Sequence, residues 1–145
     1  MNIKIHTMYF LPDFGSAPIL MDELASYLAA KGHKAEIITT IPRICNKVNY
    51  RGRLYVKEEG QGFYIKRFWT NTTPGILGRF VAWSIYVFWG MFNILTINKG
   101  DILFLRLPPL QLGLVGMLAK RLKGAKVILN VQDIHPDLAI ETGIL

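Results

Sequence analysis

Three ionisable side chains stand at alternate positions near the end of the chain: Asp133, His135 and Asp137. They follow an apolar, β-branched run over residues 127–131 that is typical of a buried parallel strand. Ligands of open α/β sheets bind beyond the carboxyl ends of the strands. A carboxylate or an imidazole in that place can act as a general base or position a hydroxyl group. We therefore predict catalytic roles for Asp133 and His135.

Asp137 has two interpretations, and the sequence leaves both open. It can contact substrate beside the other two residues, or it can cap a helix that begins at Leu138, because aspartate accepts hydrogen bonds from first-turn amides. A metal site is disfavoured, because three mixed ligands on one loop have no recognised spacing. The single cysteine, Cys45, also excludes a disulfide framework and a cysteine-based zinc cluster.

A second candidate is the turn at residues 12–16, which precedes an amphipathic segment. Gly15 would let a ligand approach the backbone, and the amino end of the helix would attract a phosphate. We predict that Asp13, Gly15 and Ser16 bind substrate, although a tight turn with Ser16 as helix cap explains the same residues. The turn matches neither the P-loop nor the dinucleotide fingerprint. Arg106, near the end of an apolar strand, would need an anionic partner, either a ligand phosphate or a neighbouring acid.

The remaining sequence alternates between strand and helix patterns, which predicts a Rossmann-like α/β fold: a parallel sheet with flanking helices. Leu20, Leu24 and Leu28 would form the buried stripe of the first helix, and His6 would be a hydrogen-bonded core residue. We predict strands at 3–9, 35–40, 101–107 and 125–131, a hairpin from 54–56 and 63–68, and helices at 17–31, 76–98 and 110–123.

The charge and the apolar residues are unevenly distributed. The formal charge is +7, and residues 43–67 hold seven basic side chains against Glu58 and Glu59. Such a segment favours phosphate-bearing partners or anionic lipid, although a solvated loop has the same composition. Residues 80–97 carry no charge over eighteen positions, about 27 Å of helix, which is near the thickness of a bilayer core.

We weigh three interpretations of this apolar helix. Polar residues within it, and sheet segments on both sides of it, favour a buried or membrane-surface helix over a membrane span. Beside a basic loop, an interfacial helix would dock on an anionic membrane. Nucleic-acid binding is disfavoured, because the aromatic residues concentrate in an apolar helix and not on a basic face.

Several segments together resemble the N-terminal domain of family-four, GT-B glycosyltransferases. They are residues 9–15 (YFLPDFG), 21–25 (MDELA) and 31–39 (KGHKAEIIT). Residues 50–55 (YRGRLY), 62–67 (GFYIKR) and 132–137 (QDIHPD) look like bacterial enzymes of capsule, O-antigen or colanic acid assembly, including the fucosamine-transferring type. The resemblance covers essentially the whole chain.

This resemblance implies a retaining transfer of sugar from a nucleotide sugar, as substrate and without a further cofactor, to a saccharide acceptor that is lipid-linked at the inner membrane. The first turn, with Gly15, would approach the donor diphosphate. Asp133 would stand near the reaction centre, with His135 and Asp137 as secondary candidates. Residues 1–145 would be the acceptor-side domain of a cytoplasmic enzyme bound peripherally to the inner face of the membrane.

Two departures from the family pattern qualify this expectation. Many relatives have two glycines in the first turn, whereas this chain has Gly15 followed by Ser16. The family's second, nucleotide-binding domain does not follow, so we expect residues 1–145 alone to transfer no sugar and to depend on a C-terminal domain, a partner or dimerisation. The alternative function is a non-catalytic, membrane-associated subunit that recruits a catalytic partner.

Overall fold

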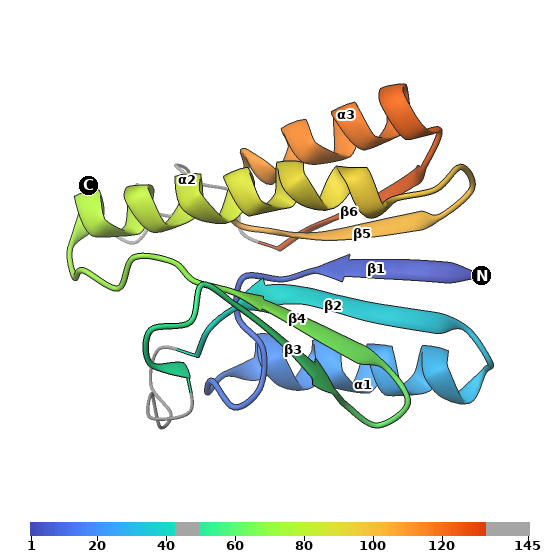
Figure 1. Cartoon of the computed structure of the whole chain (residues 1–145), viewed down its shortest axis with the longest axis horizontal. Coiled ribbons are helices and arrows are strands. Elements are labelled where there is room, and N and C mark those ends of the chain that lie inside the picture. Colours follow the sequence, from blue (N-terminus) through green and yellow to red (C-terminus); the bar gives the residue numbers. More distant parts are fainter. Residues whose placement is uncertain (43–49, 133–145) are drawn as a thin grey trace.

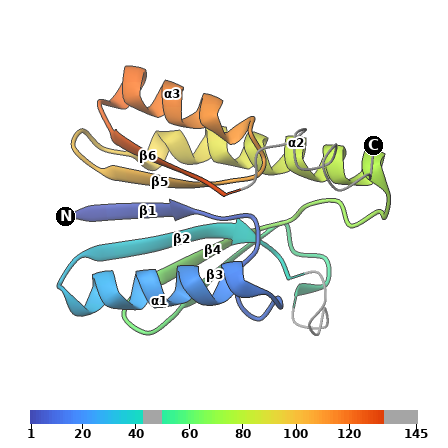
Figure 2. The same ribbon diagram turned by 180° about the vertical axis from the view of Figure 1, so that it is seen from behind.

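The computed structural model describes residues 1–42 and 50–132, which form a six-stranded sheet with helices on both faces (Figures 1 and 2). The strand order is β3-β4-β2-β1-β5-β6. The predicted Rossmann-like α/β architecture is confirmed. The strands are β1 (Asn2–His6), β2 (Lys34–Thr40), β3 (Tyr55–Glu59), β4 (Tyr64–Phe68), β5 (Ile102–Leu107) and β6 (Lys126–Val131). The helices are α1 (Ser16–Ala30), α2 (Ile76–Asn93) and α3 (Leu112–Lys123), with a 3-10 turn, η2, at Ile94–Thr96.

The central strand is β1, which pairs in parallel with β2 on one side and β5 on the other. His6 lies opposite Ile38 and Leu105 in these two ladders. Strands joined through a helical crossover are parallel, so the predicted βαβ unit formed by β1, α1 and β2 is confirmed. The predicted hairpin is also confirmed: β3 is antiparallel to β4, and β4 continues the parallel sheet beside β2.

Alternate side chains of the strands enter two separate cores, one on each face of the sheet. On the α1 face, Ile5 and Ile37 are fully buried and pack against Met21 and Ala25 of the helix. The buried stripe of α1 is therefore Pro18, Met21 and Ala25. The predicted leucine stripe was wrong at Leu20, which is 47% exposed, while Leu24 and Leu28 are partly buried at its margin.

The other face is covered by α2 and α3. Leu103 and Leu105 of β5 are buried there beneath Tyr86 of α2 and Val115 of α3. The Tyr86 hydroxyl donates a 2.9 Å hydrogen bond to the carbonyl of Ile38, so this large side chain satisfies its polar atom inside the core. The α2 helix is thereby fixed over the centre of the sheet.

Helix α2 ends earlier than the apolar pattern predicted. Its regular part stops at Asn93, whose side-chain amide donates to the carbonyl of Trp89 at 2.9 Å. The Thr96 hydroxyl donates to the Asn93 carbonyl at 2.8 Å and accepts from Lys4 Nζ at 3.1 Å. Side chains that bond to nearby backbone groups compete with the helical ladder. Within the described residues, no helix is long and apolar enough to span a membrane.

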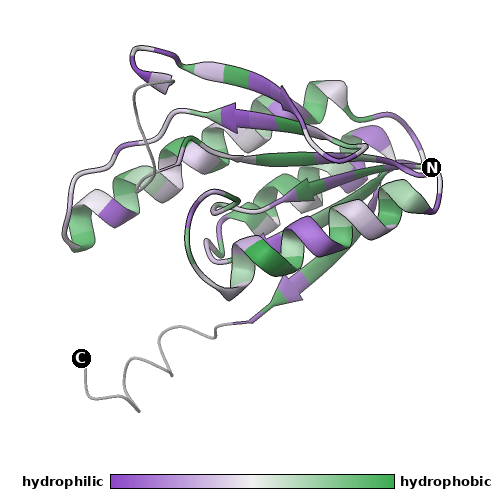
Figure 3. Ribbon diagram, turned by 90° about the horizontal axis from the view of Figure 1, so that it is seen from below, coloured by the Kyte–Doolittle hydropathy of each residue, from purple (hydrophilic) through white to green (hydrophobic). Residues whose placement is uncertain are grey.

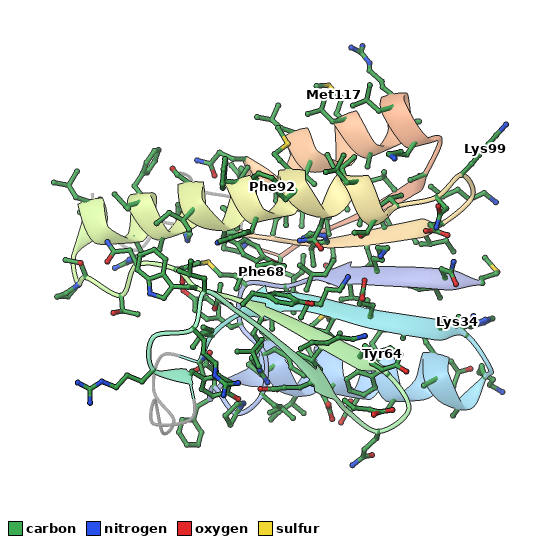
Figure 4. All side chains as sticks on the ribbon, in the orientation of Figure 1. Lys34, Tyr64, Phe68, Phe92, Lys99 and Met117 are labelled. Atoms are coloured by element: carbon green, nitrogen blue, oxygen red, sulfur yellow. The ribbon has the colours of Figure 1, made fainter. Side chains whose placement is uncertain are left out.

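The carboxyl half of α2 is also attached to the β3–β4 hairpin by aromatic contacts. Phe68 of β4 stacks on Trp89 with a centroid separation of 5.0 Å and an interplanar angle of 27°. Trp89 in turn lies 6.2 Å from Phe92, and Phe68 and Phe92, both labelled in Figure 4, line one shallow pocket between the strand and the helix. The Trp89 indole N–H donates to the carbonyl of Trp69 at 3.0 Å. The helix thus fixes the position of the segment that leaves β4.

The packing of α3 on the sheet predicts opposite effects for two glycines of that helix. A Cβ at Gly116 would lie 2.7 Å from Leu105 Cδ1 and 2.9 Å from Val127 Cγ1, whereas a Cβ at Gly113 would meet nothing within 4 Å. We expect Gly116→Ala to lower the free energy of unfolding by about 1–3 kcal/mol through overpacking. Gly113→Ala should raise it by about 0.5–1 kcal/mol, because alanine is the better helix former. Urea unfolding measures both; equal effects would contradict the packing of α3.

Candidate functional site

The site is built at the edge of the sheet where the parallel strands end. Three buried threonines fix the backbone where β1 leaves the sheet. Thr40 Oγ1 donates to the Met8 carbonyl at 2.7 Å and Thr39 Oγ1 to the same carbonyl at 3.3 Å. Thr7 Oγ1 donates to the Tyr9 carbonyl at 2.9 Å. These bonds hold the start of the loop at residues 7–15 against β2, so the turn that follows is well positioned.

The turn itself carries the three predicted substrate-binding residues. The Asp13 amide donates to the Phe10 carbonyl at 3.0 Å, and the Asp13 side chain is 4% exposed. Gly15 is the N-cap of α1, with φ +133°, a backbone conformation that favours glycine. The predicted capping role of Ser16 was wrong: Ser16 is the first helical residue, and no side chain caps the helix. The first-turn amides therefore have no side-chain cap and remain suited to an anion.

Arg67 of β4 ties this turn to the hairpin. Its side chain is 3% exposed; Nη2 donates to the Leu11 carbonyl at 2.6 Å, and Nε donates to Glu58 Oε2 at 2.7 Å. The guanidinium carbon lies 5.9 Å from the ring centroids of both Phe10 and Tyr50. From the sequence, Arg67 was only one of the seven basic side chains of residues 43–67. Its position two residues after Ile65, which is buried on the α1 face, was the signal that its side chain points inward.

Arg106 lies at the same edge of the sheet and on the same face as α1. Strand alternation places it with Phe104, which packs against the core beneath α1. It is partly exposed and not buried as the strand pattern predicted, and its Nη2 donates to Gln132 Oε1 at 2.7 Å. The structure thus places the turn at Gly15 and a guanidinium on the same face of the sheet, at the same edge.

Three of the predicted site residues, Asp133, His135 and Asp137, lie outside the residues that the structure describes. The described chain ends at Gln132, directly after β6, whose parallel pairing with β5 places its carboxyl end at the same edge as those of β1 and β2. Within residues 1–42 and 50–132, no group of three His, Cys, Asp or Glu side chains could hold a metal ion.

A second feature of this edge is a cavity of about 410 Å³ between the end of β2, the turn at residues 50–53 and the segment that follows β4. Its lining includes Trp69, Tyr50 and Arg51. The cavity was not predicted, because the three segments come together only through the pairing of β2 with β4. A tryptophan directly after a predicted strand was the available signal.

His6 is completely buried near the carboxyl end of β1, and neither ring nitrogen has a hydrogen-bond partner in the described structure. The prediction of a core histidine is confirmed, but the predicted hydrogen bonding was wrong. Burial lowers the pKa of His6 to about 3, and the nearby positive charge of Lys4 adds to the shift. Glu36 opposes it, although that carboxylate is held by Lys4 at 2.8 Å and Lys66 at 2.9 Å.

Comparison with known proteins gives structural matches only. The sequence matches no protein-family profile and no curated protein. The fold is similar to the catalytic domain of starch synthase IV from Arabidopsis thaliana bound to ADP and acarbose, with a TM-score of 0.63 and 17% identity over 91% of this chain. It is also similar to a trehalose-6-phosphate synthase structure from E. coli bound with UDP-2-fluoro glucose, with a TM-score of 0.57 and 9% identity over 89% of this chain.

Both matched proteins are GT-B glycosyltransferases, and the six-stranded sheet of this chain has the Rossmann-like fold found in that class. The chain spans about a third of the length of each, covering 34% of the first and 32% of the second. At these identities the comparison establishes the fold of the chain.

The buried, neutral His6 predicts an acid-dependent loss of stability. Above its unfolded pKa of about 6.5 the side chain is neutral in both states. As the pH falls from there toward the folded value, about 3, only the unfolded chain takes up a proton, so stability decreases. From pH 7 to 5 this residue should cost about 2 kcal/mol of unfolding free energy. His6→Leu should remove that part of the pH dependence in urea unfolding; equal losses in both proteins would contradict a neutral His6.

Proposed function

We propose that residues 1–145 form the acceptor-side domain of a retaining glycosyltransferase. The enzyme would move a sugar from a nucleotide sugar to a saccharide acceptor, lipid-linked, in bacterial surface polysaccharide synthesis. The observation that carries the proposal is that the uncapped α1 amino end, at Gly15, and the Arg106 guanidinium lie at the same edge of the sheet and on the same face. Both can meet an anionic group at the carboxyl edge of a GT-B-type sheet. The two structural neighbours were determined with ADP and with a UDP-sugar analogue, which supports a nucleotide sugar as donor.

In this proposal the turn at residues 12–16 binds the donor diphosphate. The backbone at Gly15 and the exposed first turn of α1, from Ser16, would approach the diphosphate oxygens, because amide N–H groups at a helix start attract negative charge. Asp13, buried beneath the turn, would hold the loop in the conformation that allows this approach. Arg106 would offset charge that develops on the leaving nucleotide.

The bond-forming step is assigned to residues beyond the described chain. Asp133 or His135 would accept the proton of the attacking acceptor hydroxyl or position that hydroxyl, since both side chains can act as bases near neutral pH. Asp137 would contact substrate. The donor is a substrate, and we propose no separate cofactor and no metal at these residues.

A second domain that binds most of the nucleotide would complete the enzyme, so residues 1–145 alone would transfer no sugar. That domain would be supplied by a longer chain or by a partner. The competing function is a non-catalytic, membrane-associated subunit that recruits a catalytic partner. The observation that favours it is the amount of apolar surface on α2 that no described residue covers.

We also propose a peripheral location at the cytoplasmic face of the inner membrane, through α2. Figures 1 and 2 show that the amino half of α2 extends past the carboxyl edge of the sheet, and Figure 3 shows hydrophobic residues along much of the helix. The large apolar side chains exposed on α2 are Ile76, Leu77, Phe80, Val81, Phe88, Met91 and Phe92. Arg79, exposed among them, would pair with anionic headgroups. The helix would lie in the membrane surface with the substrate edge beside it.

The donor-binding part of the proposal predicts a specific loss at Gly15. A Cβ there would stand where the diphosphate must approach the backbone, and it would strain a residue at φ +133°. We expect Gly15→Ala to lower sugar transfer by about a hundredfold, as misplacement by about 1 Å does. The measurement is transfer from a radiolabelled nucleotide sugar to lipid extract, by the protein co-expressed with the products of adjoining reading frames.

Gly32→Ala is the matched control for this variant. Gly32 also has a positive φ, +79°, and has open space around its Cβ position, but it lies after α1, away from the carboxyl edge. It should share the backbone strain and keep its activity. Equal losses of sugar transfer in the two variants would mean that Gly15→Ala acts by lowering the stability of the protein. Robust transfer by residues 1–145 alone would refute the proposed need for a second domain.

The membrane proposal predicts weaker vesicle binding when the exposed part of α2 becomes polar. Leu77 and Phe80 are 83% and 55% exposed, so Leu77→Ser with Phe80→Ser should leave the fold intact. Each side chain contributes about 1.5–3 kcal/mol when buried in lipid, so binding by the double variant should fall by about a hundredfold or more. Co-sedimentation with phosphatidylcholine vesicles, with and without phosphatidylglycerol, measures it.

The control for the vesicle experiment places the same changes on α3. Leu114 and Leu122 are 51% and 70% exposed there, and their replacement by serine should leave vesicle binding unchanged. Vesicle binding that does not increase with phosphatidylglycerol would rule out α2 as a specific anchor on an anionic membrane. Equal losses of vesicle binding in the two double variants would also rule it out.

A further inference from the structure

The cavity between the β2 end, the turn at residues 50–53 and the segment after β4 has the size and composition of a small-molecule site. Its volume of about 410 Å³ falls within the range of ligand pockets, roughly 300–1,000 Å³. Ile41 and Pro42 supply an apolar wall, and Thr70 and Thr72 line the cavity beside Trp69. An aromatic surface beside hydroxyl groups suits a ligand that is apolar on its faces and polar at its rim.

The aromatic part of the cavity is held in place from both sides. The Trp69 amide donates to the Leu54 carbonyl at 2.9 Å, and its carbonyl accepts from the Trp89 indole at 3.0 Å. The Trp69 side chain nevertheless remains 44% exposed. A large aromatic ring on a fixed backbone and open to solvent offers a stacking surface at a low entropy cost.

Tyr50 offers a ring to the cavity and not a free hydroxyl. Its hydroxyl donates to Glu58 Oε1 at 2.6 Å, and Glu58 is also paired with Arg67. Burial and this hydrogen bond raise the pKa of Tyr50, so the side chain stays neutral. The tyrosine therefore contributes shape and an apolar surface.

Arg51 supplies the charge of the site. The turn that carries it is closed by the Arg53 amide, which donates to the Tyr50 carbonyl at 3.1 Å, with Gly52 at φ +74°. Arg51 is exposed, and the ion pairs recorded among residues 1–42 and 50–132 do not include it. No carboxylate is among the lining residues that the structure describes. A guanidinium in this position matches the geometry of a phosphate group.

We propose that this cavity binds a saccharide that carries a phosphate or diphosphate group, with the sugar ring on Trp69 and the phosphate on Arg51. This assignment rests on the proposed glycosyltransferase function, in which the ligand would be the acceptor. Beyond that function, the assignment names the chemical class of the acceptor and the two side chains, Trp69 and Arg51, that select it. The same chemistry is offered by a free sugar phosphate and by a sugar linked through diphosphate to a lipid.

The test is binding to the purified protein by calorimetry and tryptophan fluorescence. The probes are N-acetylglucosamine 1-phosphate, N-acetylglucosamine, inorganic phosphate and the same sugar on citronellyl diphosphate. The sugar phosphate should bind at least about tenfold more tightly than the sugar or phosphate alone. Arg51→Ala should weaken it about tenfold and remove its advantage over the plain sugar. Trp69→Leu should weaken it similarly and remove its advantage over inorganic phosphate.

Two matched variants control for charge and for aromatic content. Arg53→Ala changes an exposed arginine of the same turn, and Tyr27→Leu changes an exposed aromatic residue of α1; neither residue lines the cavity. Both should bind the sugar phosphate within about twofold of the unmodified protein. Equal losses in Arg51→Ala and Arg53→Ala would reduce the site to diffuse charge and overturn the proposal. The proposal would also be overturned if uridine monophosphate bound more tightly than N-acetylglucosamine 1-phosphate and this binding depended on Trp69.

The lipid arm and a transfer assay separate the remaining possibilities. Tighter binding of the citronellyl diphosphate ligand than of the sugar phosphate would assign the site to a lipid-linked acceptor, and the reverse order to a soluble one. Selective sugar-phosphate binding by the purified protein, with no sugar transfer when it is co-expressed with the products of adjoining reading frames, would overturn the glycosyltransferase proposal and keep the cavity assignment. Sugar transfer that is retained in Arg51→Ala and in Trp69→Leu would keep the glycosyltransferase proposal and overturn the cavity assignment.

Discussion

The buried guanidinium of Arg67 is the interaction on which the substrate edge depends. It joins β4 to β3 through Glu58, and it joins the hairpin to the first loop through the Leu11 carbonyl. It also lies against the rings of Phe10 and Tyr50, so one side chain contacts both the loop that leads to Gly15 and a wall of the cavity. Removal of one partner of such a pair leaves an uncompensated charge and costs about 3–5 kcal/mol. The donor turn and the cavity are therefore held in a fixed relation.

Much of the fold could be predicted because local patterns and the parallel sheet agree. The β-branched run of β2, the apolar run of β5, the stop at Gly32 after α1 and the left-handed Gly124 after α3 each have a local cause. The errors arose where tertiary contacts decide. Leu20 has the spacing of a buried residue, but the face of α1 that meets Ile5 and Ile37 runs through Met21 and Ala25 instead.

The candidate site could be predicted in part. The turn at Gly15 follows directly from a strand-turn-helix pattern, and Arg106 from its place near the end of an apolar strand. Arg67 and Trp69 could not be assigned roles from their own segment, because their partners are contributed by residues distant in sequence: Leu11 for the first and Trp89 for the second. The residues proposed for bond formation, Asp133 and His135, still rest on sequence reasoning.

The hydrogen bond from the Trp89 indole to the Trp69 carbonyl has a consequence for how the two proposed ligands would influence each other. Because this contact joins α2 to the backbone of the cavity wall, a change in the position of the helix would act on the residue whose ring a sugar would stack on. Thermodynamic linkage makes such an effect mutual: attachment of the helix to a bilayer would alter affinity in the cavity by the same factor as a bound sugar alters attachment. A protein arranged in this way would sense, through one indole, whether the surface that carries its substrate is present.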